Sequence, residues 1–157
     1  MNFIDQRLQS LGIILPKASV PVANYVSYTR VGNLIFIAGQ TSVKADGTML
    51  TGRLGEDLNV ENGQEAARRC GLRLISQMKE ACEGDLTRIV RVVKLGGFVC
   101  SLPKDSGGDI PKIINGCSDL MVEIFGDAGK HARFAVGSPA LPRDAAVEID
   151  AIFEIRG

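Results

Sequence analysis

Two apolar runs separated by a proline-rich turn make up residues 131–151, which read HARFAVGSPALPRDAAVEIDA. The first run, Ala132–Val136, is short and apolar enough to form a strand. In the second, apolar side chains alternate with other residues from Val147 to Ile155. This period of two predicts a final strand with one covered face. The first run carries one charged side chain, Arg133, and the second carries Glu148 among its alternating polar positions; these two side chains are candidates for chemistry.

Two further strands are expected near the N-terminus, at Tyr25–Arg30 and Leu34–Ala38, with turn residues between them. The second of these is apolar on both faces, which predicts a central strand covered on both sides. A longer strand is expected at Leu86–Val99, because this stretch is rich in valine and isoleucine. It contains Gly96 and Gly97, and glycines inside a strand indicate a bulge or a close approach of another part of the backbone.

Helical periodicity appears in three places. Near the N-terminus, a short helix is indicated by the spacing of Leu8, Leu11, Ile14 and Leu15, and Pro16 is expected to end it. A long amphipathic helix is expected from an Asn59 cap to a stop at Gly84. Another is expected from Pro111 to Phe125, with Asp109 as its cap.

The element order is therefore β-β-α-β-α-β-β in one domain that spans residues 1–157. Two helices on one face of a mixed sheet form an α+β sandwich. The other face of the sheet then has no helical cover. Association with further copies of the chain is the simplest way to bury that face.

The chain has 157 residues, with 18 basic and 18 acidic side chains and a net charge of zero. Such a balance provides no field of one sign to attract nucleic acid or an anionic membrane, so neither is an expected partner. We identify no secretory signal at the N-terminus and no apolar stretch approaching the ~20 residues that span a bilayer.

Four cysteines are scattered along the chain without a CxxC pair, and there is one histidine, His131. A metal site is not expected from these ligands. Buried free thiols are the expected state of Cys70, Cys82, Cys100 and Cys117. The absence of a secretion signal and of disulfides favours the cytoplasm.

Three side chains could carry chemistry, and each has a structural alternative. Arg133 needs a partner on its apolar strand, either a carboxylate of the chain or the carboxylate of a bound molecule, which its planar fork suits. Glu148 lies on the face of its strand opposite Val147, where it is either a solvent-facing carboxylate or a functional acid. Tyr25 is either a packing residue or a ligand contact.

These segments resemble the RidA/YjgF family. The family's end signature is similar to Ala-Arg-x-Ala-Val and Leu-Pro-x-Asp-Ala-x-Val-Glu-Ile-x-Ala here, with the spacing from Arg133 to Glu148 kept without a gap. The resemblance also takes in Tyr25-Val, Val31–Gln40, Val93–Val99 and Ile114-Asn115. It covers roughly Asn24 to Ile155 and leaves residues 1–23 as an N-terminal extension.

This resemblance implies a chorismate-mutase-like α+β subunit. Three such subunits form a homotrimer, with their sheets in a central barrel, the helices outside and a cleft between each pair of neighbours. Active members of the family hydrolyse reactive imines and enamines to 2-keto acids and ammonia, a form of metabolite repair, and use no metal or organic cofactor. The implied partner is a small metabolite that bears a carboxylate.

The family's functional residues carry over to positions in this sequence. Arg133 matches the arginine that grips the substrate carboxylate, and Glu148 matches the acidic residue that positions water. Tyr25 matches a tyrosine at the cleft, and Asn115 matches an asparagine at its edge. Fixing the substrate would supply proximity, and Glu148 would orient or deprotonate the attacking water.

Small residues complete the implied site, and they include the main departures from the family. Ala38 and Gly39 lie where the family has a Ser-Gly pair, so one hydroxyl is missing. Ala135 stands where many members have cysteine, and Gly137 replaces a common acidic residue. Backbone groups near Gly39 and Ala135 could still hold the imine nitrogen or the water. These changes point to a divergent subgroup.

Three functions therefore compete. The first is an imine or enamine deaminase, which would lose ammonia release in Arg133→Ala. The second is a regulatory module that binds keto acids without turnover, and the missing serine and cysteine favour it slightly. The third is an endoribonuclease, an activity credited to some relatives. Neutral charge and few aromatic residues argue against that third function.

Overall fold

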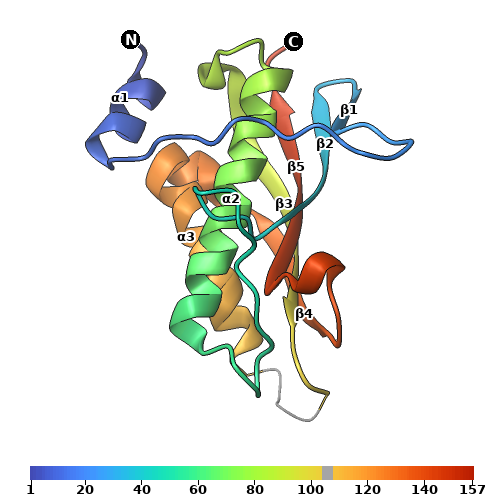
Figure 1. Cartoon of the computed structure of the whole chain (residues 1–157). Coiled ribbons are helices and arrows are strands. Elements are labelled where there is room, and N and C mark those ends of the chain that lie inside the picture. The colour runs from blue at the N-terminus through green and yellow to red at the C-terminus, as the bar shows by residue number, and fades with distance from the viewer. Residues whose placement is uncertain (104–107) are drawn as a thin grey trace.

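A five-stranded mixed sheet forms one layer of the molecule, and two long helices pack across one of its faces (Figure 1). The computed structural model describes residues 1–103 and 108–157. The strands are β1 (Tyr28–Val31), β2 (Leu34–Thr41), β3 (Ile89–Cys100), β4 (Ala132–Ser138) and β5 (Val147–Ile155). They lie in the order β1-β2-β5-β3-β4, with β3 and β4 parallel and the other neighbours antiparallel. The expected α+β class and the order of its strands and long helices are confirmed.

The helices are α1 (Phe3–Ser10), α2 (Val60–Ala81) and α3 (Ile110–Phe125). Helix α2 begins at the expected cap, because the Asn59 side chain accepts a hydrogen bond of 2.8 Å from the backbone N–H of Asn62. Gly84 follows its end in the left-handed region, with a φ of 91°. Short 3-10 helices lie at Leu86–Arg88, Gly126–Gly129 and Pro142–Asp144.

The bounds expected for the first helix are wrong. The helix starts at Phe3 because the Asn2 side chain accepts a hydrogen bond of 2.9 Å from the N–H of Asp5. It ends before Gly12, which has a φ of 66°. The apolar residues that follow lie in extended chain, and Ile14 is 91% exposed. This segment then crosses α2 (Figure 1), where the buried Ser76 hydroxyl donates a 2.7 Å hydrogen bond to the carbonyl of Pro16.

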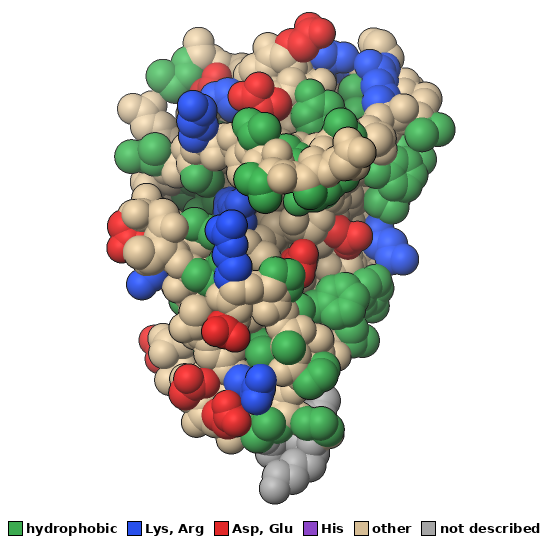
Figure 2. All heavy atoms as spheres, turned by 45° about the vertical axis from the view of Figure 1, so that its right-hand side comes forward, with side chains coloured by type: hydrophobic (Ala, Val, Ile, Leu, Met, Phe, Trp, Pro, Cys, Tyr) green, Lys and Arg blue, Asp and Glu red, His purple; other side chains and the backbone are tan. Residues whose placement is uncertain are grey.

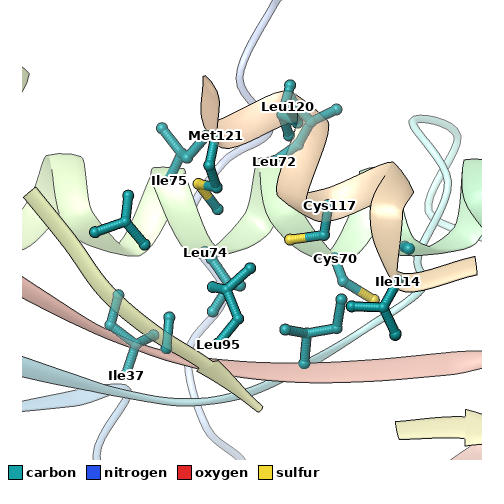
Figure 3. Close-up of a cluster of buried hydrophobic side chains, with 14 of the residues drawn as sticks. Ile37, Cys70, Leu72, Leu74, Ile75, Leu95, Ile114, Cys117, Leu120 and Met121 are labelled. Atoms are coloured by element: carbon teal, nitrogen blue, oxygen red, sulfur yellow. The ribbon is translucent and has the colours of Figure 1, made fainter. Parts of the chain in front are cut away.

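Buried apolar side chains from the inner face of the sheet and from both long helices fill the space between the two layers (Figure 3). Along β5 they alternate as expected, at Val147, Ile149, Ala151, Phe153 and Ile155. All four cysteines are buried and free, which confirms the expectation for the thiols. In the described part of the chain, no helix has the length and apolarity needed to cross a membrane.

The two glycines of β3 allow close packing. A Cβ added at Gly97 would lie 2.7 Å from Cδ1 of Ile114 on α3, and one at Gly96 would lie 2.8 Å from Cζ of Phe134. The close neighbours at this pair are side chains and its register against β5 is regular, so neither the expected bulge nor a close approach of backbone is found there. The register shifts of β3 against β5 lie earlier in the strand, before Lys94.

The outer face of the sheet exposes large apolar side chains, beside charged ones such as Asp150 and Lys94. The expectation that Leu34–Ala38 would be covered on both sides is wrong for the single chain, because Phe36 is 39% exposed. Phe98 and Phe134 pack edge to face on this side, with ring centroids 5.5 Å apart. Other exposed apolar side chains of the sheet are Val31, Val90 and Val136. Hydrophobic side chains also gather at the surface along the right-hand edge of Figure 2.

Candidate functional site

A pocket opens at the outer edge of β2, where β1 stops. Pairing between the two strands ends at Tyr28 and Ile37, so the last residues of β2 have no strand on that side. The cavity has a volume of about 370 Å³. Its walls are the N-terminal segment 19–25, residues 38–41 of β2 and the turn at Pro142–Arg143. Figure 2 shows a recess in the surface with a basic side chain on one side and acidic side chains on the other.

Four of the seven candidate site residues line this pocket: Tyr25, Ala38, Gly39 and Glu148. The other three lie elsewhere on the chain. Arg133 and Ala135 are on β4, and Asn115 is on α3. The structure therefore divides the candidates into two groups, which we call the pocket group and the β4 group.

Glu148 provides the acidic side chain of the pocket. It lies on β5 between Thr41 of β2 and Phe98 of β3, and it is half-buried. Burial raises the pKa of its carboxyl group, and the nearby charge of Asp150 raises it further. A carboxylate with a raised pKa suits the acceptance of a proton from water.

Gly39 determines how closely that carboxylate approaches the backbone of β2. A Cβ added at this position would lie 2.6 Å from Oε1 of Glu148 and 3.2 Å from its Cδ. Any other residue would therefore displace the carboxylate. The register of β2 against β5 shifts between Ile37 and Gln40, so Gly39 lies within an irregularity of the strand pair.

Two arginines of the pocket were missed by sequence reasoning. Arg73 projects from α2, and its Nη1 donates hydrogen bonds to the carbonyl oxygen of Thr41 at 2.7 Å and to its hydroxyl at 3.0 Å. Burial lowers the pKa of this guanidinium. Arg143 lies in the turn before β5 and has a φ of 54°, a conformation that non-glycine residues rarely adopt. One feature of the sequence could have indicated Arg73: it is a charged residue three positions after Cys70, beside the apolar face of the expected helix.

The β4 group lies between the edge strand of the sheet and helix α3. Arg133 Nη1 donates a 3.0 Å hydrogen bond to Oγ of Ser118, and its Nη2 donates one of 3.2 Å to the carbonyl of Pro111. Asn115 lies on the same face of α3, four residues after Pro111 and three before Ser118. Arg133 makes no ion pair with a carboxylate among residues 1–103 and 108–157.

A chain of hydrogen bonds holds Arg133 in this position. His131 Nδ1 is 2.6 Å from the carbonyl oxygen of Gly129, and that oxygen can only accept, so Nδ1 carries the proton. In the neutral ring, Nε2 then accepts from the hydroxyl of Ser118 at 2.9 Å. The Ser118 oxygen is thereby left to accept from Arg133. His131 thus acts on Arg133 through Ser118.

Comparison with known proteins reveals relatives over almost the whole chain. The family model of YjgF/chorismate mutase-like proteins matches residues 5–154. Protein TCP17 of Trypanosoma cruzi is 48% identical over 153 residues, which cover 97% of this chain and 94% of that protein. A 2-iminobutanoate/2-iminopropanoate deaminase of Dermatophagoides farinae is 28% identical over 144 residues, which cover 91% of this chain and 94% of that protein.

Among solved structures, Atu1372 of Agrobacterium tumefaciens, described as a protein of unknown function, matches with a TM-score of 0.89. It is 44% identical, and the match covers 98% of this chain and 92% of that one. Neither TCP17 nor Atu1372 is named for an activity, whereas the named deaminase is more distant. This pattern supports the expectation of a divergent subgroup.

Proposed function

This chain belongs to the YjgF/RidA family, and from that premise we propose that it hydrolyses reactive 2-imino and enamine acids to 2-keto acids and ammonia. The observation that carries the proposal is the half-buried Glu148, which has a raised pKa and is the one carboxylate among the described residues that line the pocket. The deaminase among the relatives supports the substrate class.

The site is completed by a second copy of the chain. In a homotrimer whose sheets form a central barrel, the apolar outer faces with Phe36, Phe98 and Phe134 are buried against one another. The free edge at β4 then lies beside the pocket of the neighbouring copy. Each cleft contains the pocket group of one protomer and the β4 group of the next. The exposed apolar face and the division of the candidates into two groups support this assembly.

In the proposed reaction, Arg133 holds the substrate carboxylate as a bidentate pair and orients the imine carbon toward the pocket. Glu148 accepts a proton from water as the water oxygen bonds to that carbon. The proton then passes to the nitrogen, and Glu148 accepts the proton of the new hydroxyl group as the carbon–nitrogen bond breaks. The 2-keto acid and ammonia are released, and ammonia takes up that proton as ammonium. The iminium carbon is already electrophilic, so a placed water and a proton acceptor suffice, and general-base help of this kind contributes about 10²–10⁴-fold.

The test generates imines in the assay with an amino-acid oxidase and traps them with semicarbazide. We expect the wild-type protein to lower the rate of semicarbazone formation by consuming the imine. Arg133→Ala should abolish this effect, because the substrate loses its anchor. Arg7→Gln, which changes an exposed arginine on α1, is the matched control and should leave the activity unchanged. Unaltered trapping with the wild-type protein at high concentration would contradict the proposal.

A second candidate is a module that binds carboxylate metabolites without turnover. The observation that favours it is that Ala38 and Ala135 lack the hydroxyl and thiol that the family usually places there. Under this alternative, a 2-keto acid would raise the melting temperature of the protein, while the rate of imine trapping would stay constant. The two measurements together decide between an enzyme and a binding protein.

A further inference from the structure

We infer that the pocket selects substrates with a second acidic group, which Arg73 binds with help from Arg143. The inference rests on the proposed function for the position of the first carboxylate, at Arg133 of a neighbouring protomer. The substrate class is then a 2-imino dicarboxylate of four or five carbons, the imine of an acidic amino acid.

Arg73 presents unused donors to the pocket. Its Nη1 is bound by Thr41, whereas neither Nε nor Nη2 has a hydrogen-bond partner among the described residues. The guanidinium is half-buried, and it makes no ion pair in the described part of the chain. A partly desolvated charge with free donors in a fork is the arrangement that binds a carboxylate bidentately.

Glu148 does not neutralise Arg73. Both line the same cavity, but no ion pair joins them among the described residues, and burial and the charge of Asp150 both raise the pKa of Glu148. An ion pair with Arg73 would lower that pKa instead. The two side chains come from different layers, Arg73 from α2 and Glu148 from the sheet. An acidic group of a ligand could then bind Arg73 without meeting the carboxylate of Glu148.

Charge balance also favours a dianionic ligand. Among the described residues, the pocket is lined by two guanidinium groups, Arg73 and Arg143, against the single carboxylate of Glu148. In the proposed cleft, Arg133 of the neighbour adds a third. An imino acid with one carboxylate pairs with one of these arginines, and the lining of the cleft then keeps a net positive charge. A second carboxylate on the ligand matches that surplus.

The backbone at Arg143 supports the same conclusion. Arg143 and Asp144 have φ values of 54° and 58°, in the left-handed region that costs energy for residues other than glycine. This strained turn carries the exposed Arg143 to the rim of the pocket. A cavity of about 370 Å³ accommodates a small dicarboxylic acid.

The test compares 2-oxoglutarate with 2-oxopentanoate by isothermal titration calorimetry on the intact protein. These keto acids have the same number of carbons and differ in one terminal carboxylate. We expect the wild type to bind 2-oxoglutarate at least about tenfold more tightly, as one charge-assisted pair would provide. Arg73→Gln should remove this preference and leave the affinity for 2-oxopentanoate unchanged.

Three further variants make the result decisive. Arg73→Lys keeps the charge and should retain part of the preference, and Arg143→Gln, outside the core, should reduce it less than Arg73→Gln does. Arg69→Gln changes an arginine of the same helix that pairs with Glu65 at 2.7 Å, and it should have no effect. Equal affinities in the wild type, or equal losses for both ligands in Arg73→Gln, would overturn the inference.

The outcome separates this inference from the proposed function. If the wild type prefers 2-oxoglutarate but consumes no imine in the trapping assay, the hydrolysis fails and the selectivity stands. If it consumes imines of neutral and acidic amino acids equally well and binds both keto acids equally, the hydrolysis stands and the selectivity fails.

Discussion

The pocket group and the β4 group differ in what they can do alone. The pocket encloses a carboxylate, with Gly39 against it and a cavity in front of it. The β4 group holds an arginine against α3 through Ser118 and Pro111, at an edge strand of the sheet. One group can activate water and the other can bind an anion. We propose that each group is half of a site, which the association of two chains completes.

The largest effect is expected from Glu148→Gln, which removes the proton acceptor from the pocket group alone. The imine-consuming rate should fall by about 10²–10⁴-fold. Because the pKa of Glu148 is raised, its carboxylate becomes protonated at a pH above the pKa of an ordinary glutamate. The wild-type rate should therefore start to fall at that higher pH as the solution is acidified. A pH–rate profile measures this fall. If the residual activity of Glu148→Gln falls in acid at the same pH as the wild-type activity, Glu148 is not the proton acceptor.

The same substitution should have the opposite effect on stability. A carboxyl group whose pKa is higher in the folded state binds more protons there, so stability falls as the pH rises from the ordinary value through the raised one. At neutral pH the ionised Glu148 therefore opposes folding. Glu148→Gln should raise the melting temperature at pH 7 and have little effect at pH 4, which thermal unfolding at both values would measure.

A smaller effect is expected from Gly39→Ala, which displaces the Glu148 carboxylate without removing it. The added Cβ would lie 2.6 Å from Oε1, so the carboxylate must move. Misplacement by about 1 Å can cost on the order of 100-fold in rate. Gly108→Ala is the control, because among the described residues no atom beyond its chain neighbours lies within 4 Å of a Cβ added there. Wild-type rates in both variants would show that the contact at Gly39 is irrelevant.

The smallest effect is expected from Ser118→Ala, which loosens the β4 group and leaves the pocket intact. Arg133 would lose one of its two hydrogen-bond partners on α3, although the guanidinium itself would remain. The KM should rise by about tenfold with little change in kcat, which is the lower end of what one lost hydrogen bond from a charged donor implies. Ser118→Thr should restore the wild-type KM. A fall in kcat alone would contradict a role in positioning Arg133.

Local patterns predicted most of the fold. The alternation in β5 and the stripe of α2 extend over enough residues to be read reliably, and both were found where expected. The first helix was misplaced because its start depends on the side chain of Asn2, and because Leu11 and Ile14 are apolar without being helical. The exposed face of Phe36 could not be foreseen from an apolar run that is typical of covered strands.

The site was less accessible to sequence reasoning. The resemblance indicated Tyr25, Gly39 and Glu148, which the fold brings to one pocket. Arg73 was missed because its significance depends on a contact with Thr41, 32 residues away in sequence. Arg143 was missed because the left-handed backbone conformation at this residue brings its side chain to the pocket, and the residue type does not reveal that conformation.

The most direct test of a shared site mixes two inactive variants, Arg133→Ala and Glu148→Gln, after unfolding and refolding them together. If each cleft combines Glu148 of one protomer with Arg133 of the next, random assembly restores both groups in about one quarter of the clefts. We expect about one quarter of the wild-type imine-consuming activity to return. A mixture that stays as inactive as its separately refolded components would contradict the claim that two chains build each site.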